Sequence, residues 1–328
     1  NDLLRLDHKP DLTEAGILST CQWLAFSSRR LGDRPFNFLR RKIGNVAVNL
    51  ALRRFLGERL TPFQTLELEP FSDPCQHAIS LAGHRLHLNS DLLTDYTQIR
   101  TIQQDPAELL QASALTPLDQ FVRTGKNSRD IYLFAFLLAY TSTSQVVQHK
   151  SEAMETFHYY LAVLPKNWSQ PDSWAPLNPI ALKSEANHPI LVELGGLNAT
   201  RSFKCAQVQL QPRTRTILTD EFYSLAYIHI LEHPKTRLGL HSPRRSQVHI
   251  IQPSEWGNVM VCGLEIWLTG WMSLDEYLRR SIILPAGQKT FQYSHTYYKN
   301  LCVPVSELHP LDQLLEETRT RQADQDKL

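Results

Sequence analysis

The sequence predicts an α+β protein of two domains, and three observations support this prediction. The chain has 328 residues, more than one compact domain normally holds. In its first half, segments with helical periodicity surround a stretch in which apolar and polar residues alternate. After residue 150, short strand-like segments separated by turn residues are typical of a sandwich or barrel. We therefore expect a mixed α/β/α domain over 1–150, a mostly-β domain over 151–310 and a polar tail over 311–328.

Two amphipathic helices are expected near the start of the chain. Thr13 stands ahead of an apolar pattern at helical spacing, which predicts a helix over 14–29. A second helix is predicted over 38–56, ended by Gly57. Its cations either meet phosphates or form the solvated side of the helix. With two arginines from a later loop, the candidate nucleic-acid-binding residues are Arg40, Arg41, Lys42, Arg53, Arg54, Arg244 and Arg245.

The stretch Gln76–Ser90, QHAISLAGHRLHLNS, predicts a β-hairpin whose two-residue turn is Ala82–Gly83. This turn fixes four opposing pairs, namely Leu81 with His84, Ser80 with Arg85, Ile79 with Leu86, and Ala78 with His87. Successive side chains of a strand point to opposite faces. One face is therefore aliphatic and belongs to the core. The other face carries Ala78, Ser80, Arg85, His87 and Asn89.

The remaining elements follow from composition and periodicity. A short strand is expected over 63–71, before the hairpin, and a polar helix broken at Pro106 is expected over 91–115. Residues 129–144 are too apolar to face water, and we interpret them as a buried strand, with a buried helix as the alternative. In the second half, strands are predicted at 157–165, 189–196, 203–211, 224–231, 247–252 and 258–271. Ser273 and Glu276 stand at capping-box spacing, which predicts a short helix.

The hairpin register resembles that of the PD-(D/E)XK, or restriction-endonuclease-like, family. In that family, two acids and a lysine of the hairpin and a glutamate of an upstream helix hold magnesium and activate water. The resemblance covers the first 150 residues and implies a nuclease-like core. The upstream helix of the family often carries a Gly-x-x-Ala-Glu pattern, and the segment IGNVAVNLALRRFL fits this pattern with Val48 at the position of the glutamate. The four corresponding positions here are Val48, Ala78, His87 and Asn89.

These four side chains are poor magnesium ligands, because magnesium prefers carboxylate and water oxygens. The resemblance therefore implies a degenerate site without cofactor. It also implies a non-catalytic nucleic-acid-binding or scaffolding protein, in a bacterial DNA-processing or defence complex. One alternative is an active, magnesium-dependent nuclease whose acids come from Glu67, Glu69, Asp73 and Asp91. Another is a protein-interaction module that makes no contact with nucleic acid.

Charge and cysteine content restrict the partners. The net charge is +1, but residues 1–60 hold 11 Lys/Arg against 6 Asp/Glu, a local excess of +5. Residues 201–250 hold 8 against 3, again +5. Such clusters favour DNA or RNA as a partner, although solvated faces also produce them. The five scattered cysteines indicate reduced thiols in a cytoplasmic protein, and the apolar run Ile131–Tyr140 is too short to span a membrane.

Overall fold

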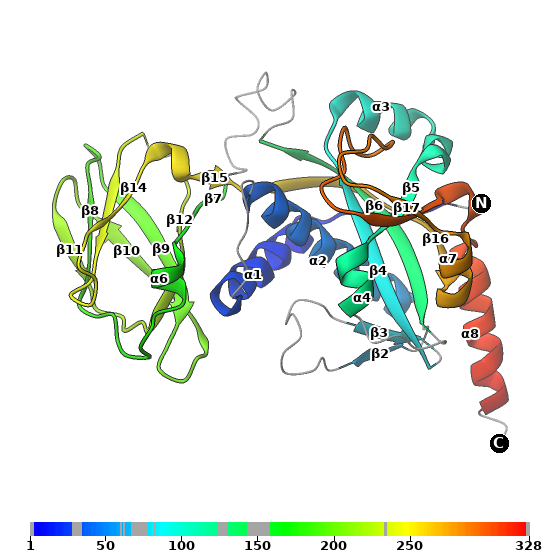
Figure 1. Ribbon diagram of the computed structural model, residues 1–328, viewed down its shortest axis with the longest axis horizontal. Coiled ribbons are helices and arrows are strands. Elements are labelled where there is room, and N and C mark those ends of the chain that lie inside the picture. The colour runs from blue at the N-terminus through cyan, green and yellow to red at the C-terminus, as the bar shows by residue number, and fades with distance from the viewer. Residues whose placement is uncertain are drawn as a thin grey trace. The chain divides into compact units, whose positions relative to one another are not determined.

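The computed structural model describes residues 3–27, 35–59, 61, 63–66, 78–81, 83–123, 130–142, 158–232 and 235–325. Helices and strands are both abundant, which confirms the α+β class (Figure 1). The chain divides into two compact units. Unit 1 contains 1–16, 41–149 and 261–328, and unit 2 contains 17–40 and 150–260.

This division differs from the predicted one in two places, because residues 17–40 belong to unit 2 and residues 261–328 belong to unit 1. Strand β16 (Val261–Ser273) pairs with two strands of unit 1, so the chain returns to that unit at residue 261. The predicted polar tail over 311–328 is helix α8 (Leu311–Gln325) as far as Gln325, and its Leu314 and Leu315 are buried. The sequence alone did not predict the pairing of β16, because β1 and β6 lie far away from it along the chain.

Unit 1 contains a six-stranded sheet in the order β1-β16-β6-β4-β3-β2. Its other strands are β1 (Leu4–Asp7), β2 (Phe63–Leu66), β3 (Ala78–Leu81), β4 (His84–Leu93) and β6 (Ile131–Thr141). Strands β4 and β6 are parallel, and the other neighbours are antiparallel. The predicted buried strand is confirmed as β6.

The hairpin register is confirmed for three of its four predicted pairs, Leu81 with His84, Ser80 with Arg85 and Ile79 with Leu86. Gly83 has φ +78°, as the tight turn requires. Strand β4 is longer than predicted and continues to Leu93. The following helix therefore begins only at Tyr96, where the Asp95 side chain accepts a hydrogen bond from the Gln98 amide.

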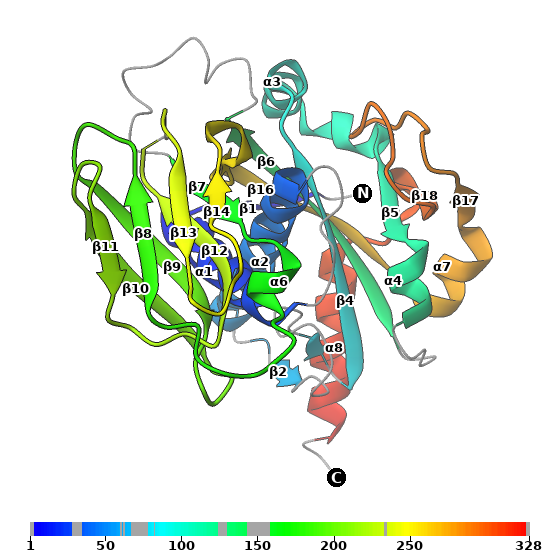
Figure 2. The ribbon, with the colours of Figure 1, turned by 60° about the vertical axis from the view of Figure 1, so that its left-hand side comes forward.

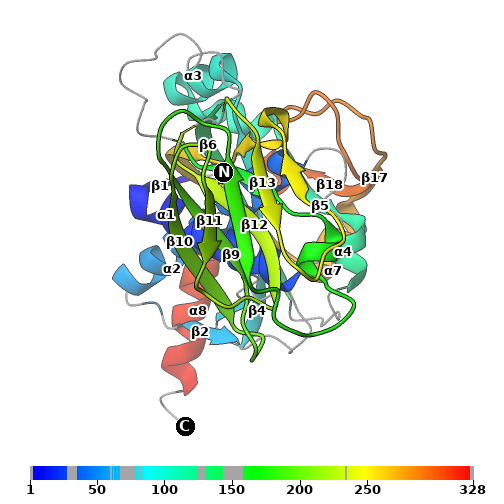
Figure 3. The same cartoon turned by 90° about the vertical axis from the view of Figure 1, so that its left-hand side faces the viewer.

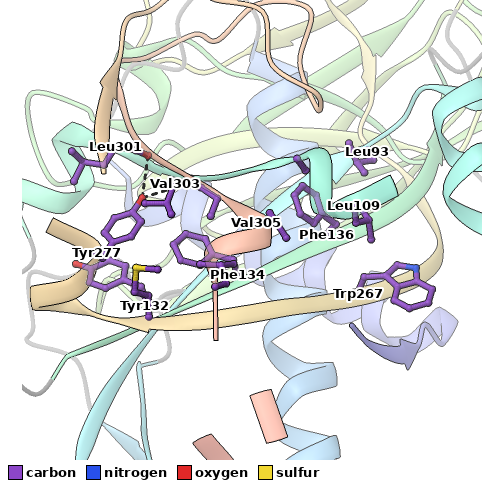
Figure 4. Close-up of a cluster of buried hydrophobic side chains, with 14 of the residues drawn as sticks. Leu93, Leu109, Tyr132, Phe134, Phe136, Trp267, Tyr277, Leu301, Val303 and Val305 are labelled. Carbon is purple, nitrogen blue, oxygen red and sulfur yellow. Dashed lines mark hydrogen bonds between the residues drawn. The ribbon is translucent and has the colours of Figure 1, made fainter. Parts of the chain in front are cut away.

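The two faces of the six-stranded sheet are covered by different elements (Figure 2). Helix α2 (Pro35–Glu58) covers one face, where a Cβ on Gly44 would lie 3.1 Å from Leu137 Cδ2. An apolar cluster covers the other face and includes Tyr132, Phe134 and Phe136 (Figure 4). The elements on that side are α3 (Tyr96–Gln104), η1 (Pro106–Gln111), β5 (Ser113–Pro117), α4 (Leu118–Arg123), α7 (Leu274–Arg280), β17 (Ile282–Leu284), β18 (Asn300–Pro304) and η3 (Val305–Glu307).

The first two helices begin earlier than predicted, each with a proline in the first turn. Helix α1 spans Pro10–Phe26, so Thr13 lies inside the helix. Its hydroxyl donates to the Val261 carbonyl oxygen (2.9 Å). Proline favours the first helical position because its φ is already helical and that position needs no amide donor. The predicted cap at Ser273 is confirmed, because its hydroxyl accepts from the Glu276 amide at the start of α7.

Unit 2 contains two antiparallel sheets around one apolar core (Figure 3). The five-stranded sheet is formed by β7 (Tyr160–Val163), β9 (Ile190–Leu197), β10 (Phe203–Leu210), β12 (Ser224–Ile230) and β15 (Gly257–Asn258). The four-stranded sheet is formed by β8 (Ile180–Ser184), β11 (Arg215–Leu218), β13 (Leu238–His241) and β14 (His249–Ile251). Short helical turns are α6 (Lys166–Ser169) and η2 (Pro253–Glu255). Strands β8, β11 and β13 were not predicted. Within the described ranges, no helix combines the length and apolar character needed to cross a membrane.

Candidate functional site: the polar row of β4

The candidate site is a row of polar side chains on β4, at and beside the positions that the nuclease resemblance marks. The row consists of Arg85, His87, Asn89 and Asp91, which share one face because side chains alternate along a strand. In the parallel register with β6, the last three neighbour Tyr132, Phe134 and Phe136, respectively. The row therefore faces the apolar cluster of Figure 4, and not helix α2.

Asp130 closes the first end of the row. It immediately precedes β6, and its side chain is only 2% exposed. Arg85 donates two hydrogen bonds to this carboxylate, from Nε to Oδ1 (3.0 Å) and from Nη2 to Oδ2 (2.6 Å). A paired guanidinium of this geometry compensates a buried carboxylate well. The Asp130 charge is thus already balanced within the protein.

His87 lies between this ion pair and the apolar cluster. Its Nε2 atom is 3.1 Å from Asp130 Oδ2, and its ring stacks on Tyr132 with 5.0 Å between ring centroids. Burial lowers the pKa of His87 below its ordinary value of 6.5, although the nearby Asp130 acts in the opposite direction. The imidazole is therefore neutral at neutral pH.

Asp91 occupies the other end of the row. Its carboxylate accepts hydrogen bonds from the Tyr293 hydroxyl (2.6 Å) and from Gln292 Nε2 (2.9 Å). Burial raises the pKa of Asp91, and the two hydrogen bonds oppose this shift. Between the two ends, the buried Nδ2 atom of Asn89 has no hydrogen-bond partner among the residues that the structure describes.

Arg41 lies beside the Asp91 end of the row, and its guanidinium carbon is 4.6 Å from the Tyr293 ring centroid and 4.8 Å from that of Tyr297. Tyr297 and Tyr298 are 45% and 46% exposed. The segment 285–300 adds Lys289 and Lys299, both exposed, and contains no acidic residue. One arginine and two tyrosine side chains therefore meet at this end of β4.

Val48 does not join the row. Ser90, which faces the opposite side of β4, accepts a hydrogen bond at its Oγ atom from the side-chain amide of Asn45 in α2 (2.7 Å). Val48 follows Asn45 by three residues, so it lies on the same side of the helix, and it is fully buried. Val48 is therefore on one side of the sheet and His87 and Asn89 are on the other, contrary to what a shared metal site requires.

Carboxylates do not converge at this site in the described part of the chain. Asp91 and Asp130 lie at opposite ends of the row and have separate partners. Among the described residues, no group of three or more His, Cys, Asp and Glu is arranged to hold a metal ion. Glu67, Glu69 and Asp73 lie outside the described residues, as does the side chain of Ala78.

Most of the predicted nucleic-acid-binding residues are buried, half-buried or paired with another side chain of the protein. Arg40 is buried and donates to the Asn258 carbonyl oxygen (3.0 Å from Nε), so its guanidinium is engaged within the protein. Arg54 pairs with Asp11. Arg53 has buried Nε and Nη2 atoms without partners among the described residues, and Lys42 is half-buried.

The two loop arginines of unit 2 differ from each other. Arg245 stacks over Trp168, with its guanidinium carbon 5.6 Å from the ring centroid, and its Nε and Nη2 atoms are buried. Arg244 is exposed. Of the seven predicted residues, Arg41 and Arg244 remain the best placed to meet a phosphate.

Unit 2 contains a second polar cluster, centred on Glu193. The hydroxyls of Tyr159 and Tyr227 donate to its Oε1 atom at 3.3 Å and 3.2 Å. The thiol of Cys21 lies 3.6 Å from the Tyr159 hydroxyl, and that of Cys205 lies 3.2 Å from the Tyr227 hydroxyl. Burial raises the pKa of Cys21 to about 12 and also raises the pKa of Cys205. These thiols are therefore protonated and unreactive at neutral pH.

Sequence reasoning missed Asp130, Gln292 and Tyr293. Asp130 had a usable signal, because it directly precedes the apolar run of β6, and a parallel neighbour would place it beside the hairpin. Gln292 and Tyr293 come from a segment about 200 residues after Asp91, and no local pattern connects them to β4.

Comparison with known proteins finds no matching family model, curated protein or solved structure.

Proposed function

We propose that this chain is a non-catalytic nucleic-acid-binding protein built on a restriction-endonuclease-like core. The order of elements supports this proposal. Helix α2 is followed by the β3–β4 hairpin, by α3 and by the buried strand β6, which is parallel to β4. The same order of helix, hairpin, helix and buried strand is expected for a nuclease-like α/β/α core.

The proposal that the protein does not cleave nucleic acid rests on the pairing of Asp130 with Arg85. Phosphodiester hydrolysis by this family requires a metal ion that polarises the phosphate and activates water. The one buried carboxylate beside His87 is occupied by two hydrogen bonds from a guanidinium. Recruiting Asp130 to a magnesium ion would break both hydrogen bonds of this ion pair, so the pair favours the metal-free state.

The surface beside this row supports binding of single strands. Arg41 is held against Tyr293 and Tyr297, and Lys289 and Lys299 lie in the same acid-free segment. Exposed aromatic rings stack on unpaired bases, while cations follow the phosphates. Tyr298, which is 46% exposed, can provide a further stacking surface.

Fluorescence anisotropy with a labelled single-stranded DNA of about 20 nucleotides tests the proposal. We expect binding that weakens as salt rises, because binding releases counterions. Arg41→Ala and Tyr297→Ala should each weaken it several-fold. The matched control is Arg54→Ala, since Arg54 lies on the same helix but already pairs with Asp11.

Two other outcomes would replace the proposal. Cleavage that requires magnesium and is lost in Glu69→Gln or Asp73→Asn would establish an active nuclease with relocated acids. No binding of DNA or RNA even at low salt would instead indicate a protein-interaction module. Equal binding of DNA by Arg41→Ala and by the wild type would show that the surface around Arg41 and Tyr297 is not the binding site.

A further inference from the structure

The four-stranded sheet of unit 2 has one face turned away from the sandwich core. Its inward residues, among them Leu182 and Leu240, belong to the apolar core, so the alternate positions point outward. Val248, just before β14, also lies on the outward side, because a Cβ on Gly239 would be 3.6 Å from its Cγ1 atom. The outward residues, which we call the outer face, are Ala181, Lys183, Arg215, Ile217, Gly239, His241, Val248 and Ile250.

The outer face is more apolar than a solvated sheet face needs to be. Ile217, Val248 and Ile250 are 59%, 53% and 45% exposed. Antiparallel sheets usually turn polar side chains toward water on the face that does not pack on the core. None of the eight outer-face residues is Asp, Glu, Ser, Thr, Asn or Gln. Ile217 lies at the β11 edge of this face and Val248 and Ile250 lie at its β14 edge, so the apolar side chains flank the cations of the outer face on two sides.

The charge of this surface is positive. Lys183 and Arg215 are exposed and face each other across β8 and β11. The adjoining acid, Glu185, is neutralised by Arg237, which donates from Nε (3.0 Å) and Nη2 (2.7 Å). The outer face together with Glu185 and Arg237 therefore has a net charge of +2, from three cations and one acid.

One polar atom of the outer face also lacks an internal partner. The Nδ1 atom of His241 is buried and makes no hydrogen bond within the described ranges. Buried ring nitrogens are normally paired, because an unsatisfied polar atom is costly. Protein atoms cover this nitrogen, so the groups of the outer face that a bound molecule can reach are the aliphatic and cationic side chains, and not His241 Nδ1.

We propose that the outer face binds an acidic amphipathic segment of a partner protein. The aliphatic side chains would contact the apolar side of that segment, and Lys183 and Arg215 would pair with its carboxylates. Charge complementarity disfavours a second copy of this chain, since cations would then oppose cations. Single-stranded nucleic acid is also disfavoured, because the outer face has no Phe, Tyr or Trp on which bases could stack. This surface is separate from the β4 polar row and does not depend on the nuclease-like core.

Two synthetic peptides of about 18 residues, with Leu at helical spacing and either Glu or Lys at the other positions, serve as probes. Fluorescence anisotropy measures their binding to the full chain. We expect the Glu peptide to bind at least tenfold more tightly than the Lys peptide. The double variant Lys183→Glu, Arg215→Glu should reverse this preference, and Ile217→Ser should weaken binding of the Glu peptide several-fold.

The matched control is Leu191→Ser, because Leu191 is 48% exposed but lies on the other sheet of the sandwich. It should leave binding unchanged. Equal binding of the two peptides, or equal loss of binding in Leu191→Ser and Ile217→Ser, would overturn the proposal. A concentration-dependent dimer in sedimentation that Ile217→Ser abolishes would assign the face to a second copy. Displacement of the Glu peptide by a DNA single strand, with that displacement lost in the charge-reversed variant, would assign it to nucleic acid.

Discussion

Arg85 and Asp130 form a two-pronged ion pair between β4 and the start of β6. Asp130 is almost fully buried, whereas the Arg85 side chain remains 33% exposed. The pair joins the hairpin to the central strand of the sheet and holds a carboxylate beside His87. Its loss should therefore affect both the stability of the sheet and the titration of the histidine.

Replacing only one member of this pair should be the more harmful change. Arg85→Met leaves the Asp130 carboxylate buried without its main partner, which we expect to lower the free energy of unfolding by about 3 kcal/mol. The double variant Arg85→Met, Asp130→Leu should recover much of this loss, because neither charge then remains buried. Urea denaturation of the two variants measures the difference. A double variant no more stable than Arg85→Met would show that the unpaired carboxylate is not the cause.

His87 should make the protein sensitive to mild acid. Its pKa is lowered in the folded protein, so the unfolded chain takes up a proton first as the pH falls below 6.5. The stability that neutral His87 contributes is complete above pH 6.5 and is lost as the pH falls toward its folded pKa. For one group the slope is at most about 1.4 kcal/mol per pH unit.

His87→Gln should reduce this pH dependence between about pH 7 and pH 5. Comparison with wild type is needed, because burial also lowers the pKa of His8, His229 and His249, which remain in both proteins. Unfolding free energies across this range provide the measurement. If the unfolding free energy changed with pH in the same way in both proteins, burial of the His87 imidazole would be contradicted.

The thiols near Glu193 should differ in accessibility but not in thiolate content. Cys21 is only 3% exposed and has its pKa raised to about 12, while Cys205 is exposed. We expect iodoacetamide to modify Cys205 slowly and Cys21 only after unfolding. Mass spectrometry of the native and urea-treated protein measures both sites. Rapid modification of Cys21 in the native protein would show that the face of α1 that carries this thiol is not buried beside Tyr159.

The likeness of the hairpin to a nuclease site can be tested by rebuilding its acids. If the confirmed register continues by one pair, Ala78 stands opposite His87, and cross-strand Cβ atoms are then about 5 Å apart. The variant Ala78→Asp, His87→Asp, Asn89→Lys should lose stability through repulsion between carboxylates and regain it when magnesium binds. The melting temperature against magnesium concentration is the measurement, with His87→Asp alone as the control. A triple variant that responds no more than the control would remove the main support for the resemblance.

Local patterns were sufficient for some elements of the fold. The alternation in the hairpin and the apolar run of β6 each carry their own periodicity, so both could be predicted. The position of β16 could not be, because nothing in its apolar sequence distinguishes pairing with β6 from pairing within the sandwich. The same limit applies to the site. His87 and Asn89 were found through the hairpin, whereas Gln292 and Tyr293 are connected to Asp91 only by the folded chain.

The return of the chain to unit 1 at Val261 has a consequence during synthesis. Strand β6 ends at Thr141, and its partner β16 begins 120 residues later (261 − 141). At about 5–20 residues per second, a ribosome needs roughly 6–24 s to make the intervening chain. During that interval, the apolar edge of a nascent β6 has no β16 to pair with, whereas unit 2 is complete at residue 260. The sandwich can therefore finish folding first, and β6 is the segment that a cotranslational chaperone would most need to protect.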